Sequence, residues 1–139
     1  MLKRQSSFAP ASRPTVTQKR ILVVDDDRAV ADSLTFMLSH EGYAAKAAYS
    51  GQEAIELSKQ LRPDLLIIDV VMPGISGTEA AVQICKVLYN CHVILFSGQI
   101  KGKQLVEEAR TGGSDFEVIE KPLHPQDLLA KIRGHLPRS

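Results

Sequence analysis

The segment PDLLIIDVVMPGISG (residues 63–77) contains the pattern that decides the fold. Its continuous run of branched apolar residues, 65–68, ends directly at Asp69 and is followed by a loop with proline and glycine. Such a run is typical of a strand that is covered on both faces of a parallel sheet. Ser76 and Glu79 then form a capping box, which predicts the start of a helix. The segment therefore predicts a strand, a tight loop and a helix, with an acid at the carboxyl end of the strand.

The same unit recurs on both sides of this segment. Short apolar runs lie at 21–24, 43–48, 65–68, 93–96 and 116–119, and the spacing leaves room for one helix between consecutive runs. Five such units predict an α/β fold of the flavodoxin-like, doubly wound type, with a five-stranded parallel sheet in the order 2-1-3-4-5 and five helices. The alanine-rich second run is the weakest, which favours an edge position for that strand.

Apolar residues at a period of 3.6 predict the helices between the runs. The expected buried stripes are Val30, Leu34, Met37 and Leu38; Ala54, Leu57, Ser58 and Leu61; Ala80, Ala81, Ile84, Val87 and Leu88; Leu105, Val106 and Ala109; and Leu128, Leu129, Ile132 and Leu136. Ser50 and Glu53 form a second capping box, and Pro125 fits the first turn of the last helix.

Charge is divided unevenly along the 139 residues. Residues 1–20 hold five cations and no acid, which gives +5, whereas residues 21–139 hold 12 cations and 16 acids, which gives −4. An acidic body excludes a strongly basic core that binds nucleic acid directly. We expect a flexible basic tail at 1–19, with serine and proline, and one domain at 20–137.

Composition excludes further classes of protein. No apolar run approaches the ~18–20 residues that span a bilayer, so no membrane insertion is expected. Cys85 and Cys91 form no CxxC pair, and two reduced, packed thiols favour a cytoplasmic location.

Acids, a hydroxyl and an amine follow the predicted strands at their carboxyl ends, where ligands bind in an open α/β sheet. Asp25, Asp26 and Asp27 follow the first strand, and Asp69 follows the third. Ser97 ends the fourth and Lys121 ends the fifth. Carboxylates that meet at one edge repel each other, and Mg²⁺, which prefers oxygen ligands, resolves that repulsion.

A metal, a lysine and a hydroxyl together suit phosphoryl transfer onto a carboxylate. The site therefore predicts phosphoryl transfer onto Asp69. The loop after Asp69 can turn a main-chain carbonyl, that of Val71, back toward the metal, because Pro73 and the glycines allow a tight reversal.

Four segments, in this order and spacing, resemble the receiver domain of response regulators, the phosphoacceptor module of two-component signalling. They are ILVVDDD (21–27), PDLLIIDVVMPGISG (63–77), VILFSG (93–98) and EKPL (120–123). The resemblance runs from about Arg20 to Leu136 and implies a signalling module in phosphorelay signal transduction rather than an enzyme.

The resemblance also implies roles for single residues. Asp25 and Asp26 would bind Mg²⁺, Asp26 directly and Asp25 through water, and Asp69 and the Val71 carbonyl would complete the protein ligands. Asp69 would be the phosphoacceptor and would take the phosphoryl group from a phosphohistidine of a histidine kinase or a histidine phosphotransfer protein. Asp27 would cap the first helix.

Ser97 would hydrogen-bond a phosphoryl oxygen, and Gly98 would keep the pocket open. Lys121 would pair with a phosphoryl oxygen, and the bond from Lys121 to Pro122 is a candidate cis peptide.

One position departs from the receiver pattern. An aromatic residue usually lies three residues before the lysine and changes rotamer when the hydroxyl moves; here that residue is Val118. Phe116 shares its face by strand alternation, so either Phe116 substitutes or the switch lacks an aromatic residue. Ser97, Phe116 and Val118 are the switch candidates, and we expect an altered switch. Val71 and Gln99 flank the site, and we predict that Val71 hinders water and lengthens the phosphorylated lifetime.

Other readings remain beside this one. A pseudo-receiver would act through contacts alone, without phosphorylation. A haloacid-dehalogenase-like phosphohydrolase would need an acid at the position of Val71. A flavodoxin-like protein that binds FMN is disfavoured, because the three aspartates after the first strand would repel the FMN phosphate. Because the chain ends at Ser139, just past the last expected helix, we expect a stand-alone module that acts on an unidentified protein target.

Overall fold

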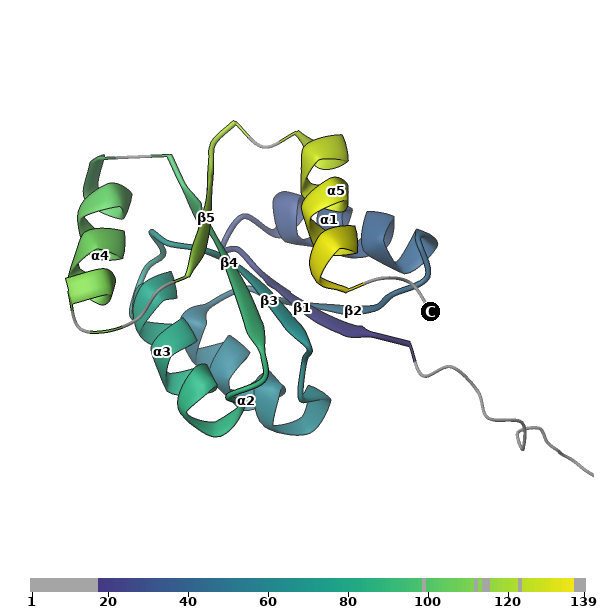
Figure 1. Ribbon diagram of the computed structural model, residues 1–139, viewed down its shortest axis with the longest axis horizontal. Helices are drawn as coiled ribbons and strands as arrows, with labels where there is room; N and C mark the ends of the chain where they lie inside the picture. The colour runs from purple at the N-terminus through teal and green to yellow at the C-terminus, as the bar shows by residue number, and fades with distance from the viewer. Residues whose placement is uncertain (1–17, 99, 112, 114–115, 123, 137–139) are drawn as a thin grey trace, which may run out of the picture.

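The protein is an α/β sandwich of three layers, seen in a computed structural model that describes residues 18–98, 100–111, 113, 116–122 and 124–136 (Figure 1). Strands and helices alternate along the chain: β1 Arg20–Val24, α1 Arg28–His40, β2 Ala44–Ala48, α2 Gly51–Leu61, β3 Leu65–Asp69, α3 Gly77–Val87, β4 His92–Ser97, α4 Ile100–Thr111, β5 Glu117–Glu120 and α5 Pro125–His135. The sheet is parallel, with the order β2-β1-β3-β4-β5. The predicted fold class, strand order and edge position of β2 are confirmed.

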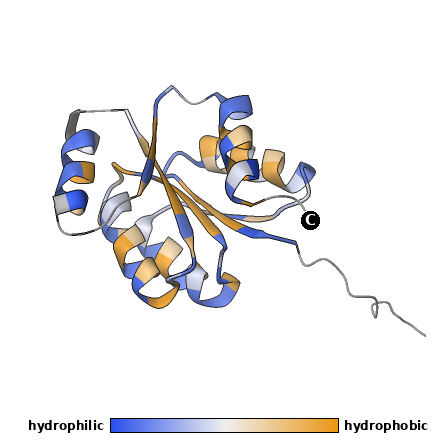
Figure 2. Ribbon diagram, viewed as in Figure 1, coloured by the Kyte–Doolittle hydropathy of each residue, from blue (hydrophilic) through white to orange (hydrophobic). Residues whose placement is uncertain are grey.

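Alternation along the central strands divides the core between the two faces of the sheet. Ile21 and Val23 of β1 pack in a cluster with α1 and α5, whereas Leu22 and Val24 pack in a cluster with α2, α3 and α4. β1 is apolar from residue 21 to 24 and β3 from residue 65 to 68, as the orange parts of the central strands in Figure 2 show, because helices cover both faces of the sheet. Because helices cover both faces of the sheet, ligands can reach it at the ends of the strands.

The register brings the carboxyl ends of the central strands to one edge. Val24 pairs with Ile68 across β1 and β3, and Asp69 pairs with Phe96 across β3 and β4. Ser97 in turn pairs with Glu120 at the end of β5. The residues that follow β1, β3, β4 and β5 therefore share this edge, as the sequence predicts.

Side-chain caps begin three helices where the sequence predicts them. Asp27 accepts hydrogen bonds from the amides of Ala29 and Val30, and Ser50 and Ser76 each accept one from the amide three residues on. His124, which lies at the N-cap position of α5, makes no side-chain capping bond. No helix in the described part of the chain is long and apolar enough to cross a bilayer.

The predicted burial is wrong for two residues of the helical stripes. Val30 is 36% exposed, and its neighbour Ala31 is buried instead, because Ala31 is in phase with Leu34 and Leu38. Val87 is 63% exposed at the end of α3. Neighbouring helical positions point about 100° apart, so two adjacent apolar residues can differ widely in burial.

Candidate functional site

Three carboxylates form a cluster at the shared edge of the sheet. One carboxylate oxygen from each of Asp25, Asp26 and Asp69 lies within 4.8 Å of the others. Asp25 and Asp69 are buried, with 3% and 7% exposure, while Asp26 is exposed. The amide of Asp27 donates a 2.9 Å hydrogen bond to Asp25 Oδ1, which fixes that carboxylate at the start of α1.

The cluster carries negative charge in a partly desolvated place. Burial raises the pKa of Asp25, and the neighbouring Asp69 and Asp26 raise it further. Burial also raises the pKa of Asp69, although the Lys121 ammonium and a hydrogen bond from the Val71 backbone oppose the rise. A hard divalent cation suits three such carboxylates, because it prefers oxygen ligands and offsets their mutual repulsion.

Lys121 reaches the cluster from the end of β5. Its Nζ lies 3.3 Å from Asp69 Oδ1, and its backbone amide donates to the carbonyl of Ser97. A Cβ atom on Gly98 would lie 2.7 Å from Lys121 Cβ, so the glycine makes room for the lysine stem. The peptide bond from Lys121 to Pro122 is cis, as the resemblance implied.

The loop after β3 makes a tight turn next to Asp69. The amide of Gly77 donates a 2.8 Å hydrogen bond to the Val70 carbonyl. A Cβ atom on Gly77 would lie 2.8 Å from the carbonyl carbon of Asp69, so only glycine allows this approach. The tight reversal through the glycines of this loop was predicted from the sequence, but the contact of Gly77 with the Asp69 carbonyl was not.

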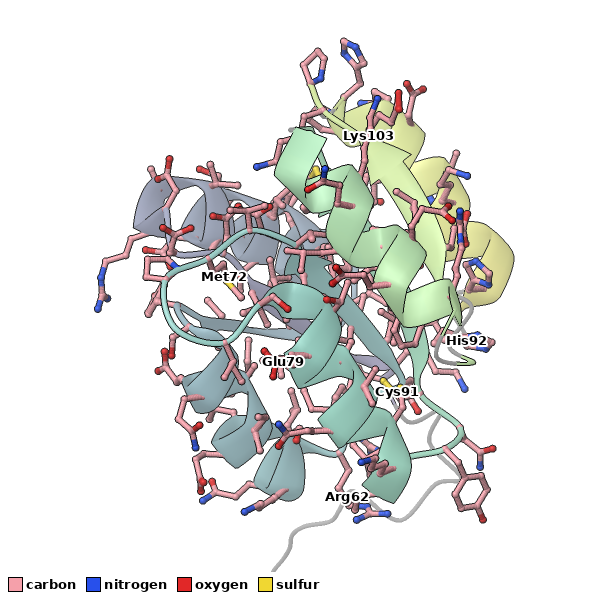
Figure 3. The ribbon with its side chains drawn as sticks, turned by 90° about the vertical axis from the view of Figure 1, so that its left-hand side faces the viewer. Arg62, Met72, Glu79, Cys91, His92 and Lys103 are labelled. Atoms are coloured by element: carbon pink, nitrogen blue, oxygen red, sulfur yellow. The ribbon has the colours of Figure 1, made fainter. Side chains whose placement is uncertain are left out.

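Two residues of this loop line a hollow at the carboxylate cluster, called the acidic hollow below. Val71 is half-buried beside Asp69, and Met72 is 7% exposed on the loop that leads from β3 to α3 (Figure 3). The hollow is lined by Asp25, Asp26, Asp27, Val30, Asp69, Val71, Met72, Pro73 and Lys121.

Ser97 is not among the residues that line this acidic hollow. It lines a second hollow, between α4 and β5, with Val106 and Val118 in its walls. Ser97 is 2% exposed, and its Oγ has no hydrogen-bond partner among the described residues. The structure therefore brings the acids, Val71 and Lys121 together, and places the predicted hydroxyl in the adjoining hollow.

Phe116 and Val118 lie on one face of the sheet, as strand alternation predicts. Both are partly buried and pack against the core cluster on the side of α2, α3 and α4. Val118, unlike Phe116, also lines the hollow that contains Ser97. Gln99, the other flanking position of the sequence analysis, lies outside the described residues.

The fold and the acidic edge define the class of the protein. Residues 21–133 match the response regulator receiver domain, so the chain belongs to that family, a flavodoxin-like module of two-component signalling. Receiver domains are in general signalling modules rather than enzymes.

Curated relatives agree with this assignment. The chain is 37% identical to the response regulator MprA of Mycobacterium ulcerans over 120 residues, which cover 86% of this chain and 51% of that protein. It is 32% identical to the DNA-binding response regulator MtrA of Mycobacterium tuberculosis over 125 residues, which cover 88% and 52%. The chain thus spans about half the length of the curated relatives it matches.

Solved structures show the same architecture. A CheY-like receiver domain protein of Methanospirillum hungatei matches with a TM-score of 0.74 and 32% identity, covering 85% of this chain and 93% of that one. The response regulator TrrA of Thermotoga maritima, solved in complex with Mg²⁺ and beryllium fluoride, matches with a TM-score of 0.72 and 32% identity, covering 86% and 100%.

Proposed function

We propose that this receiver domain accepts a phosphoryl group on Asp69 and transmits the signal through contacts with other proteins. The observation that carries the proposal is the position of Asp69, between two further carboxylates and the Lys121 ammonium, whose Nζ lies 3.3 Å from Asp69 Oδ1. A carboxylate is an effective nucleophile when cations balance the charge that develops around it.

The donor in this proposal is a phosphohistidine of a histidine kinase or a histidine phosphotransfer protein. An Asp69 carboxylate oxygen attacks the phosphorus, so a P–O bond forms while the P–N bond of the donor breaks. The departing imidazole nitrogen keeps the electron pair of that bond and takes up a proton. Because Asp69 itself is modified, the chemistry is directed at the protein and no separate substrate is turned over.

Asp25, Asp26, Asp69 and the Val71 carbonyl would hold Mg²⁺ at this site. Two buried acids with raised pKa values and an exposed third are a donor set that fits a hard cation. When bound, Mg²⁺ supplies positive charge that stabilises the developing charge on the phosphoryl oxygens. The complex of TrrA with Mg²⁺ and beryllium fluoride supports this choice of metal.

Two further residues complete the site. Lys121 pairs with a phosphoryl oxygen, for which its 44% exposed side chain leaves the ammonium accessible. After rotation about its Cα–Cβ bond, the Ser97 hydroxyl donates a hydrogen bond to another phosphoryl oxygen. The buried Oγ, which has no partner among the described residues, thereby gains one.

The partners in this proposal are proteins. A histidine kinase or histidine phosphotransfer protein supplies the phosphoryl group in the cytoplasm, and a further protein reads the modified state. A complex named CheX–CheY–BeF₃–Mg²⁺ from Borrelia burgdorferi, which matches with 28% identity and a TM-score of 0.70, supports recognition of a receiver by another protein.

Intact-mass measurement tests the proposal. Wild-type protein incubated with acetyl phosphate and Mg²⁺ gains the mass of one phosphoryl group, and excess EDTA prevents the gain. Asp69→Asn abolishes it, whereas Asp127→Asn, on the exposed first turn of α5, leaves it unchanged. No gain in the wild type, or an equal gain in Asp69→Asn, would reject Asp69 as the acceptor.

A further inference from the structure

Gly102 lies in the first turn of α4, directly against the residue that supplies the proposed hydroxyl. A Cβ atom on Gly102 would lie 3.0 Å from Ser97 Oγ and 3.8 Å from Ser97 Cα. The same atom would lie 3.4 Å from Cγ2 of Val71, which lines the acidic hollow. Gly102 is buried, so this helix turn packs closely against the end of β4.

The Ser97 hydroxyl is the part of this contact that can move. Its Oγ is enclosed without a hydrogen-bond partner among the described residues, an arrangement that is unfavourable for a buried hydroxyl. A serine side chain has three staggered positions about its Cα–Cβ bond. By contrast, Ser97 Cα is held by the pairing of Ser97 with Glu120 in the sheet.

We propose that Gly102 is a positioning residue for Ser97. The space above Gly102 admits the hydroxyl in its orientation toward α4, where Ser97 lines the hollow with Val106 and Val118 and stays out of the acidic hollow. This inference rests on the proposed function, because the alternative orientation is the one in which Ser97 meets a phosphoryl group on Asp69.

The two orientations are states of one equilibrium. A methyl group on residue 102 would crowd Oγ only in the orientation toward α4, so it would shift the population toward the orientation that serves Asp69. A ligand that needs the second orientation then binds more tightly, because less of its binding free energy is used to turn the hydroxyl. The missing side chain at Gly102 thus allows the Ser97 hydroxyl of the unmodified domain to stay oriented toward α4.

Beryllium trifluoride with Mg²⁺ is the probe, since it is a stable analogue of a phosphoryl group on a carboxylate. Its affinity is measured by ¹⁹F NMR titration of wild type, Gly102→Ala, Ser97→Ala and the double variant. Gly134→Ala is the matched control, because Gly134 also lies in a helix, α5, and a Cβ there meets nothing within 4 Å. Both replacements exchange a helical glycine for alanine, which has the higher helix propensity.

We expect Gly102→Ala to bind the probe about 3–10-fold more tightly than wild type, a change of the size that a shift between two nearly balanced states produces. Gly134→Ala binds like wild type. In the Ser97→Ala background, Gly102→Ala gives no gain, because the hydroxyl that it displaces is gone.

Other results would overturn the inference. Equal or weaker binding by Gly102→Ala, or a gain that persists without the Ser97 hydroxyl, means that Gly102 does not act through Ser97. If wild type fails to bind the probe, the proposed function itself fails, and the inference fails with it. If circular dichroism shows that Gly102→Ala does not fold, the NMR resonance of the Gly102 amide is followed instead. The inference then requires that this resonance shift when the probe binds to wild type and that it not shift when the probe is added to Ser97→Ala.

Discussion

At the scale of single residues, the acidic cluster is a place where function and stability oppose each other. Asp25 and Asp69 are buried, and both have a raised pKa because burial disfavours their charged forms. Asp26 adds a third negative charge, while Lys121 alone among the residues lining the hollow brings a positive one. Folding without a cation therefore works against this repulsion, as is common at functional sites.

Replacing Asp25 by Asn should stabilise the metal-free protein. The amide keeps the oxygen that accepts the Asp27 amide hydrogen, but it removes a desolvated charge beside Asp69. We expect the free energy of unfolding in EDTA to rise by about 0.5–2 kcal/mol, as for other stabilising substitutions. Urea denaturation measures the change, with Asp127→Asn as the exposed control. A lower stability for Asp25→Asn would contradict repulsion as the dominant effect.

Val71 should prolong the phosphorylated state. Its half-buried side chain lines the acidic hollow next to the proposed acceptor, where an apolar group hinders the approach of water. We expect Val71→Asn to lose the phosphoryl group about 3–10-fold faster, which is less than the ~10²–10⁴-fold effect of a fully positioned general acid or base. The decay of the phosphorylated mass after removal of acetyl phosphate measures the rate, and an unchanged rate would refute the idea.

Gly77 should tolerate no side chain. A Cβ there would meet the carbonyl group of Asp69, which is backbone and cannot rotate aside. We expect Gly77→Ala to lower the free energy of unfolding by about 1–3 kcal/mol, the usual cost of forcing an extra carbon into a packed site. Gly134→Ala, which meets open space, should be neutral or stabilising in the same urea titration. Equal stabilities of the two variants would show that the loop relaxes.

At the scale of elements, β5 and α5 are joined by charged contacts away from the acidic edge. Glu117, at the start of β5, accepts hydrogen bonds from Lys131 at 2.8 Å and from the His135 ring at 2.5 Å. Arg133 of the same helix donates to Glu41 at 2.7 Å. The first two bonds fix α5 to β5, the strand that leads to Lys121, and the third fixes α5 to the C-terminal end of α1.

Stability should fall in acid through Glu117. Hydrogen bonds from Lys131 and His135 lower its pKa in the folded state, so its contribution is present above its ordinary pKa of 4.5 and is lost as the pH falls through the lower folded value. We expect Glu117→Gln to flatten part of the decline in melting temperature between about pH 5 and about pH 3. Glu56→Gln, whose exposed pair with Lys59 spans 3.7 Å, is the control and should follow wild type. Parallel curves for wild type and Glu117→Gln would contradict this assignment.

The elements were largely predictable from the sequence because their signals are local. Apolar runs gave the strands, and Asp27, Ser50 and Ser76 capped helices where their spacing indicated. Val30 and Val87 were placed wrongly, because periodicity alone cannot decide which of two adjacent apolar residues faces the core. That choice depends on the exact angle at which each helix lies on the sheet.

At the scale of the whole molecule, the acidic cluster accounts for most of the charge of the body. Asp25, Asp26 and Asp69 are three of its 16 acids, and without them 13 acids face 12 cations. The rule that ligands bind at the carboxyl ends of parallel strands predicts the place of these acids and of Lys121 from the sequence alone. It could not give the orientation of the Ser97 hydroxyl, because that depends on how closely the first turn of α4 packs back against the end of β4.

The most direct test of the central claim is to locate the phosphoryl group. After incubation with acetyl phosphate and Mg²⁺, borohydride reduces an acyl phosphate of aspartate to homoserine, which tandem mass spectrometry assigns to a position. The account predicts homoserine at residue 69, only when both the donor and Mg²⁺ were present. Homoserine at residue 25 or 26, or a modified histidine with residue 69 intact, would contradict it.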